Sequence, residues 1–60
     1  SDKAWLRQYD YLKGYRRLFP KSWPDEGTQY PESNPLGQWC VVQRTAFREN
    51  VLKPYQLKVG

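Results

Sequence analysis

Apolar side chains recur at helical spacing in the first third of the chain. They follow one another at steps of four, three, three and four residues, as Trp5, Tyr9, Leu12, Tyr15 and Phe19. This period places them on one side of an amphipathic helix, which we predict from about Asp2 to Leu18. Ser1 or Asp2 can cap its start. Pro20 ends it, because proline disfavours helical backbone in the residue before it.

Residues 20 to 35 break every regular pattern. The segment holds four prolines and Gly27 among polar side chains, so we expect a long loop without regular structure. Loops of this length are uncommon in compact domains and tend to be functional or mobile. Trp23 interrupts the polarity of the loop. The preferred interpretation is that Trp23 folds back to cover the core, and the alternative is that it stacks on a base.

A second helix should follow the loop. Asn34 can cap it through its side chain, and Pro35 suits the first helical position. The apolar face repeats at helical spacing through Leu36, Trp39, Cys40, Gln43, Ala46 and Phe47. We expect the helix to reach about Arg48 or Glu49. Gly37 costs about 1 kcal/mol relative to alanine inside a helix, so its place in the first turn predicts a close approach by another segment or a ligand, with packing preferred.

The end of the chain predicts a third, short helix. Asn50 can end the second helix because asparagine tolerates left-handed backbone. Pro54 can then open a helix that turns Tyr55, Leu57 or Val59 inward. The fold class is therefore all-α: a compact three-helix domain, one unit over residues 1–60, with a long proline-rich loop between its first two helices. We expect the two long helices to pack through Trp5, Leu12, Leu36, Trp39 and Phe47.

Length and cysteine content narrow the class of protein. A chain of 60 residues buries only about 60% of the surface of its unfolded form, so its three Trp, five Tyr and two Phe must supply much of the core. A lone Cys40 and the absence of histidine exclude an internal disulfide and a zinc-ligand set, and no cofactor is indicated. The lone cysteine fits the reducing environment of the cytoplasm. The longest apolar run, Trp39 to Val42, is far too short to span a membrane. A start at Ser1 without any methionine predicts a domain taken from a longer protein.

Side chains that could carry chemistry do not form a catalytic set. The only thiol, Cys40, falls on the apolar face of the second helix, where we expect a small core residue. Asp25 and Glu26 lie in a loop without a partner that would tune them, so we expect solvated charges. No Gly-rich loop that could hold phosphates is present, so the domain should not bind ATP by itself. We therefore expect no enzymatic activity from this chain.

Polar and basic residues on the second helix are the candidates for binding. A buried amide needs hydrogen-bond partners, so we expect Gln43 to bind backbone groups of the loop or first helix rather than a base. Arg44 and Arg48, one helical turn apart, present two guanidinium groups that suit neighbouring phosphates. An exposed helix edge, with Arg48 paired to an acidic neighbour, is the alternative. The net charge of +4 favours anionic partners but also serves solubility, so charge alone decides neither way.

The spacing of two motifs resembles one protein family. The first half carries Trp5, Tyr9, Leu12 and Tyr15, then the pair Trp23 and Pro24; the second carries Leu36, Gly37, Gln38 and Trp39, then Gln43, Arg44 and Leu52. This arrangement resembles the helicase-associated domain, a small three-helix module appended, often in several copies, to bacterial superfamily 2 helicases. Pro20 replaces a glycine usual in that family, and its closing residues are absent at Leu57 to Gly60. The resemblance implies that the chain ends early in its third helix or is a contracted variant.

A function follows from the resemblance as an expectation. It implies a non-catalytic accessory domain that binds nucleic acid, DNA or RNA, beside the helicase domains of the same protein. Arg44 and Arg48 would contact the phosphate backbone with little sequence preference. Three further basic residues would join them: Lys13, Arg17 and Lys21. The alternative is a protein-interaction module that docks onto the parent helicase through exposed aromatics such as Tyr11 and Tyr30.

Overall fold

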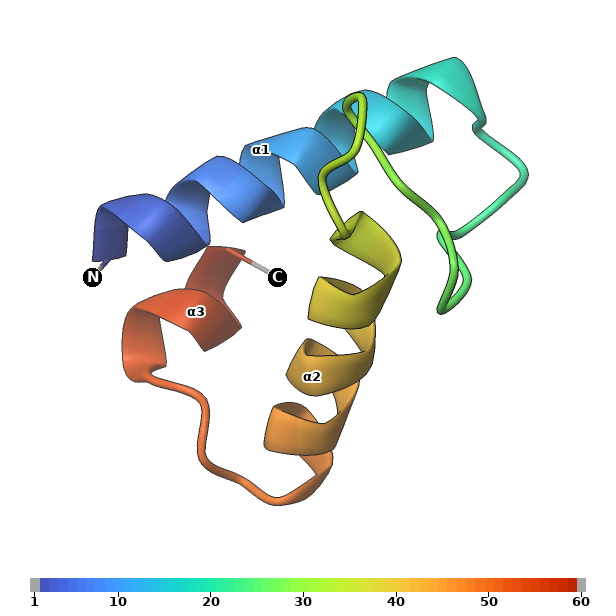
Figure 1. Cartoon of the computed structure of the whole chain (residues 1–60). Coiled ribbons are helices and arrows are strands. Elements are labelled where there is room, and N and C mark those ends of the chain that lie inside the picture. The colour runs from blue at the N-terminus through green and yellow to red at the C-terminus, as the bar shows by residue number, and fades with distance from the viewer. Residues whose placement is uncertain (1, 60) are drawn as a thin grey trace.

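Three helices form in the order that the sequence predicts. The computed structural model describes residues 2–59, so the cap proposed at Ser1 and the closing Gly60 lie outside it. Its elements are α1 (Asp2–Leu18), α2 (Leu36–Arg48) and α3 (Pro54–Val59), with a long loop between α1 and α2. α1 crosses above the other two, with α2 beginning beneath its carboxyl-terminal half and α3 beneath its amino-terminal half (Figure 1). The prediction of a three-helix, all-α fold is confirmed.

The beginning of α2 differs from the prediction. The Asn34 side chain does not cap the helix, because its Nδ2 donates to Oε1 of Gln8 on α1 at 2.8 Å, and Pro35 takes the N-cap position without a side-chain bond. A backbone group serves instead, since the Gly37 N–H donates to the Thr28 carbonyl at 2.9 Å. The loop thus folds across the start of α2, and Asn34 joins this region to α1.

The ends of α2 and α3 follow local chemistry. Asn50 adopts left-handed backbone with φ of 64°, as its side chain permits. Its N–H donates to the Phe47 carbonyl at 3.1 Å and the Val51 N–H to the Ala46 carbonyl at 3.0 Å, the paired bonds of a Schellman motif. At the start of α3, the Gln56 side chain accepts the Lys53 N–H at 2.9 Å. That bond is one half of a capping box, and it places Pro54 at the first helical position.

Among residues 2–59, the buried residues gather in a small centre where the loop meets α2. Leu36 is 0% exposed and Cys40 5%, and Pro24 and Gly37 are also buried. Trp5, Leu12 and Trp39 are half-buried. Two expectations about the core are wrong, because Trp23 is 61% exposed and Phe47 is 66% exposed. Pro24 is fully buried in the place expected for its neighbour Trp23.

Gly37 is the position where the loop backbone lies closest to α2. A Cβ atom on this residue would collide with the carbonyl oxygen of Asp25 and come within 2.8 Å of that of Glu26. The loop holds its shape here through a turn in which the Asp25 carboxylate accepts the Gly27 N–H at 3.0 Å. The Thr28 N–H donates to the Asp25 carbonyl at 3.1 Å. Asp25 is exposed, as expected. Its hydrogen bonds also organise the turn that packs on Gly37.

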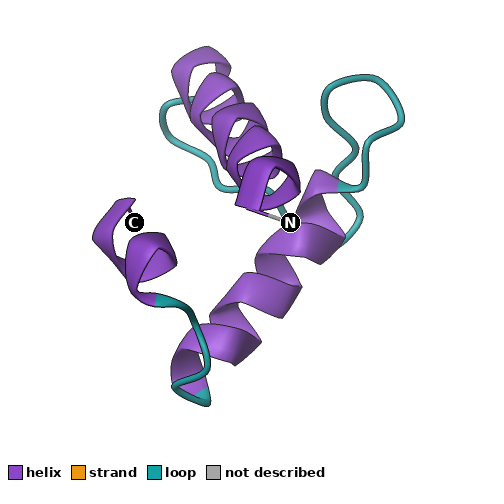
Figure 2. Ribbon diagram, turned by 90° about the vertical axis from the view of Figure 1, so that its left-hand side faces the viewer, coloured by secondary structure: helices purple, strands orange, loops and turns teal. Residues whose placement is uncertain are grey.

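Trp5 joins all three helices. Its ring stacks on Tyr9 within α1 at 5.6 Å, lies tilted against Trp39 of α2 at 5.5 Å, and meets Tyr55 of α3 edge-on at 5.6 Å. The Tyr9 hydroxyl also donates to the Val59 carbonyl, a second link between α1 and α3. In the view turned by 90°, α2 and α3 form the two arms of a V joined at its lower end (Figure 2). No helix within residues 2–59 is long and apolar enough to cross a membrane.

A separate aromatic cluster anchors the loop to the far end of α1. Tyr15 lies 4.9 Å from Phe19 and meets Tyr30 of the loop edge-on at 5.6 Å. The Tyr30 hydroxyl would lie only 3.2 Å from a Cβ on Gly14, so the ring rests directly on the helix surface. Tyr30 is therefore half-buried and packed, which removes it from the exposed aromatics expected for docking.

Candidate nucleic-acid interface

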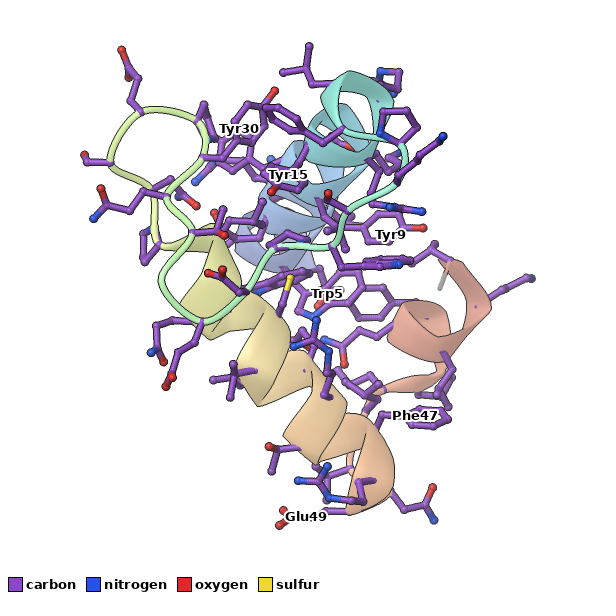
Figure 3. All side chains as sticks on the ribbon, turned by 90° about the vertical axis from the view of Figure 1, so that its right-hand side faces the viewer. Trp5, Tyr9, Tyr15, Tyr30, Phe47 and Glu49 are labelled. Carbon is purple, nitrogen blue, oxygen red and sulfur yellow. The ribbon has the colours of Figure 1, made fainter. Side chains whose placement is uncertain are left out.

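An open groove of about 560 Å³ lies on one side of the described part of the chain. Its volume falls within the range usual for ligand sites, about 300–1,000 Å³. The three helices and the long loop all contribute to its lining: Trp5, Tyr9, Leu12, Trp23, Trp39, Cys40, Gln43, Arg44, Phe47, Arg48, Leu52 and Gln56. Figure 3 shows Tyr9, Trp5 and Phe47 succeeding one another down the side of the molecule where α2 faces α3. Five of the twelve lining residues are thus aromatic.

Gln43 forms a hydrogen bond with one of these aromatic rings. Its Oε1 accepts the indole Nε1–H of Trp5 at 2.9 Å, in a partly buried position. The sequence predicted backbone partners, and that detail is wrong, because the Trp5 ring lies between Gln43 and the backbone of α1. The bond nevertheless joins α2 to α1, as expected. It holds the indole in one orientation and gives the only polar atom of that ring a partner.

Arg44 and Arg48 lie on the same groove. Both side chains line it, one turn apart on α2. The ion pairs among residues 2–59 are Lys13 with Asp10 and Lys53 with Asp2, so neither arginine is matched by a carboxylate there. Arg48 makes one long hydrogen bond to Oγ1 of Thr45, at 3.5 Å. The local acidic partner considered for Arg48 is therefore not found, and both guanidinium groups are free to bind an anion.

A second hollow of about 520 Å³ adjoins the groove. Tyr9, Leu12 and Trp23 line both, so the two form one continuous surface. The remaining lining residues of the second hollow are basic: Lys13, Arg16 and Arg17. The structure therefore brings Lys13 and Arg17, expected from the sequence, to the same surface as the arginines of α2. Lys21, also expected there, lines neither hollow.

Arg16 is the basic residue that sequence reasoning missed. Its guanidinium lies over the Trp23 ring, 4.0 Å from the centroid, and donates to the Ser22 carbonyl at 2.5 Å. A signal for it was present, since Arg16 follows Leu12 by one helical turn and so belongs to the apolar side of α1. A guanidinium on that side stacks readily on an aromatic ring. Arg16 thus fixes Trp23 at the junction of the two hollows.

Lys13 is held by one exposed ion pair. Its Nζ lies 3.2 Å from Oδ1 of Asp10 and 5.2 Å from the centre of the Tyr9 ring. The ion pair is exposed, and exposed pairs contribute only about 0–1 kcal/mol. An incoming phosphate can therefore compete with Asp10 for Lys13 at little cost.

Charge is separated along α2. Glu26 lies at its amino-terminal end, where its carboxylate accepts a hydrogen bond from the Gln38 amide at 3.3 Å. Arg44 and Arg48 occupy the carboxyl-terminal half. An acidic group near the start of a helix and a basic group in its last turn, here Arg48, both interact favourably with the helix dipole. Glu49, the C-cap residue, adds one negative charge at this end, so Arg44 and Arg48 leave it with a net positive charge.

Cys40 lines the groove, but its thiol is not activated as a nucleophile. Burial raises the pKa of its thiol above the ordinary value, and the nearby Arg44 lowers it by a smaller amount. The thiol therefore stays protonated at neutral pH, as a small core side chain does. Within residues 2–59, no three His, Cys, Asp or Glu side chains gather into a group that could hold a metal ion.

No protein-family model, curated protein or solved structure matches the chain. The resemblance to the helicase-associated domain accordingly rests on the spacing of the motif residues alone.

Proposed function

We propose that this chain is a non-catalytic, nucleic-acid-binding accessory domain of a helicase or a related protein. One observation carries the proposal: Arg44 and Arg48 line an aromatic groove together, and neither is paired with a carboxylate within residues 2–59. Unpaired guanidinium groups one turn apart suit successive phosphates, which they bind bidentately. The motif spacing, which resembles the helicase-associated domain, supports the same function.

Binding would draw mainly on phosphate neutralisation. Arg16 and Arg17 extend the basic surface into the adjoining hollow, and Lys13 joins them once released from Asp10. Each phosphate neutralised releases counterions, so affinity should fall steeply with salt and depend little on base sequence. Lys21 lines neither hollow, so its part would be limited to long-range attraction.

The role is proposed as accessory rather than enzymatic. The chain lacks histidine, the side chain whose ordinary pKa suits a general base at neutral pH. The pKa of its buried thiol is raised, so this thiol is not an activated nucleophile. Any ATP-driven movement would come from helicase domains of the same protein, which are the proposed partners in cis. A cytoplasmic location accords with the unpaired Cys40.

The experiment is a salt titration with a charge-matched control. Replacing Arg44 and Arg48 together by alanine should weaken oligonucleotide binding and flatten the plot of log affinity against log salt by about two phosphate contacts, or ~1.4–1.8 units of slope. The control replaces Lys3 and Arg7, two exposed basic residues on α1 that line neither hollow. It removes the same charge elsewhere and should change the slope far less. Equal effects of the two double variants would refute a specific role for the groove.

A protein-docking module is the alternative. Tyr11 and Tyr30, the aromatics expected to dock, are both half-buried, and Tyr30 packs on Tyr15. Docking is supported instead by two exposed apolar side chains at and just beyond the carboxyl-terminal end of α2, Phe47 and Val51. Binding to a protein partner that is insensitive to salt, with no binding to oligonucleotides, would decide for docking.

A further inference from the structure

Two large aromatic rings lie exposed on the proposed binding surface. Trp23 is 61% exposed and Phe47 66%, although both line the groove. Nine large apolar side chains are exposed within residues 2–59, and three of them are aromatic. Of these three, Trp23 and Phe47 line the groove and Phe19 does not. Exposed aromatic faces inside a concave, basic surface are the feature on which unpaired bases stack.

Both rings extend from parts of the chain that contacts hold in place. Trp23 precedes Pro24, which is fully buried, and carries the Arg16 guanidinium 4.0 Å from its ring centroid. Phe47 follows Gln43 by one turn of α2, and Gln43 is tied to Trp5 on α1. Each ring therefore extends from backbone that the fold fixes, which lowers the entropy lost when a ligand binds.

Each ring also has basic neighbours. Phe47 lies between Arg44 and Arg48 along α2, and Trp23 shares the adjoining hollow with Arg16 and Arg17. Positive groups beside a stacking ring match the alternation of base and phosphate along a nucleic-acid strand.

We propose that this surface binds a single strand of nucleic acid, with unpaired bases stacked on Trp23 and Phe47 and phosphates bound by the arginines beside them. The inference rests on the nucleic-acid binding proposed above and adds the form of the ligand. In a duplex the bases are already stacked on one another, so these rings would find no base faces to contact. Gln43 lines the groove, but its Oε1, which a bidentate contact with an adenine edge would need, already accepts the Trp5 Nε1–H.

The test compares strands of about ten nucleotides by fluorescence anisotropy at two salt concentrations. The probes are labelled oligothymidine, labelled oligouridine, and a labelled duplex of the same length. We expect the single strands to bind roughly tenfold or more tightly than the duplex. The difference in affinity between the two single-stranded probes then shows whether the surface prefers DNA or RNA. Trp23→Leu and Phe47→Leu should each weaken single-strand binding by about 5- to 150-fold while the salt slope stays as in the parent chain.

Phe19→Leu is the matched control, because Phe19 is also an exposed aromatic, 49% exposed, but lines neither hollow. It should leave affinity unchanged. Circular dichroism checks that each variant is folded. If the Trp23 variant does not fold, the Phe47 variant alone tests the inference. Salt-dependent binding that is equal for duplex and single strand, or unaffected by the ring variants, would overturn this inference and leave the proposed function standing. Absence of binding to every probe would overturn both.

Discussion

Gly37→Ala isolates the contact between the loop and the start of α2. The new methyl group would collide with the Asp25 carbonyl and lie within 2.8 Å of the Glu26 carbonyl oxygen. Both are backbone atoms, so the whole turn must move rather than a flexible side chain. Such a movement would stretch the hydrogen bond from the Gly37 N–H to the Thr28 carbonyl, now 2.9 Å.

Three terms set the size of the effect. Alanine gains at most about 1 kcal/mol over glycine from helix propensity. Displacing well-packed backbone costs about 1–3 kcal/mol, and a buried N–H left without its acceptor costs about 1–3 kcal/mol. The net loss of stability should be about 3 kcal/mol, a large part of the roughly 3–9 kcal/mol expected for a domain of this size. At about 4–8 °C per kcal/mol, Tm should fall by more than ~10 °C.

Gly27→Ala provides the control within the same turn. A Cβ on Gly27 meets its nearest neighbour, Oδ1 of Asp25, at an ordinary 3.8 Å. We expect a change of Tm within a few degrees, or a slight gain from a stiffer unfolded chain. Far-ultraviolet circular dichroism during heating, and urea titration, measure both variants. A Gly37→Ala protein as stable as the parent, or equal losses from the two variants, would refute the close packing of residues 25–26 on α2.

Three further predictions concern single residues. Gln43→Leu leaves the Trp5 Nε1–H without its partner and should cost about 1–2 kcal/mol by urea titration, whereas adding Trp5→Phe should reduce the cost assigned to position 43 in a double-mutant cycle. Asn50→Val places a β-branched residue at φ of 64° and should cost about 1–2 kcal/mol in thermal unfolding, while Asn50→Gly should be tolerated. Burial raises the pKa of the Cys40 thiol, so the folded state holds that proton more tightly than the unfolded state. Its contribution to stability is complete below the ordinary thiol pKa and is lost as pH rises through the raised value, and Cys40→Ala should remove that part of the alkaline decline.

Each of these has a clear contrary result. Additive losses at positions 5 and 43 would mean that their hydrogen bond contributes nothing. Equal stability of the valine and glycine variants at position 50 would refute the left-handed cap. Alkylation of Cys40 at the same rate in the folded chain and in denaturant would show that the thiol is not buried.

The sequence by itself determined the three helices, the ends of the first two and the start of the third. Pro20, Asn50 and Pro54 act on the backbone of their immediate neighbours, so their effect does not depend on the rest of the fold. The helical period also identified the inward side of α1 and α2. It marked Gly37 as a point of close approach, because a glycine in the first turn of a helix needs a packing reason.

The tertiary structure alone decided which partners these side chains have. Asn34 bonds Gln8 rather than capping α2, and Gln43 bonds the Trp5 indole rather than backbone, because other elements lie opposite them. Periodicity gives the direction in which a side chain points but not what covers it. Phe47 therefore faces the groove as its spacing predicts yet stays exposed, and Trp23 stays exposed because Pro24 is buried in its place. Burial and binding surface depend on where three helices and a long loop meet in space, which is information that no local pattern carries.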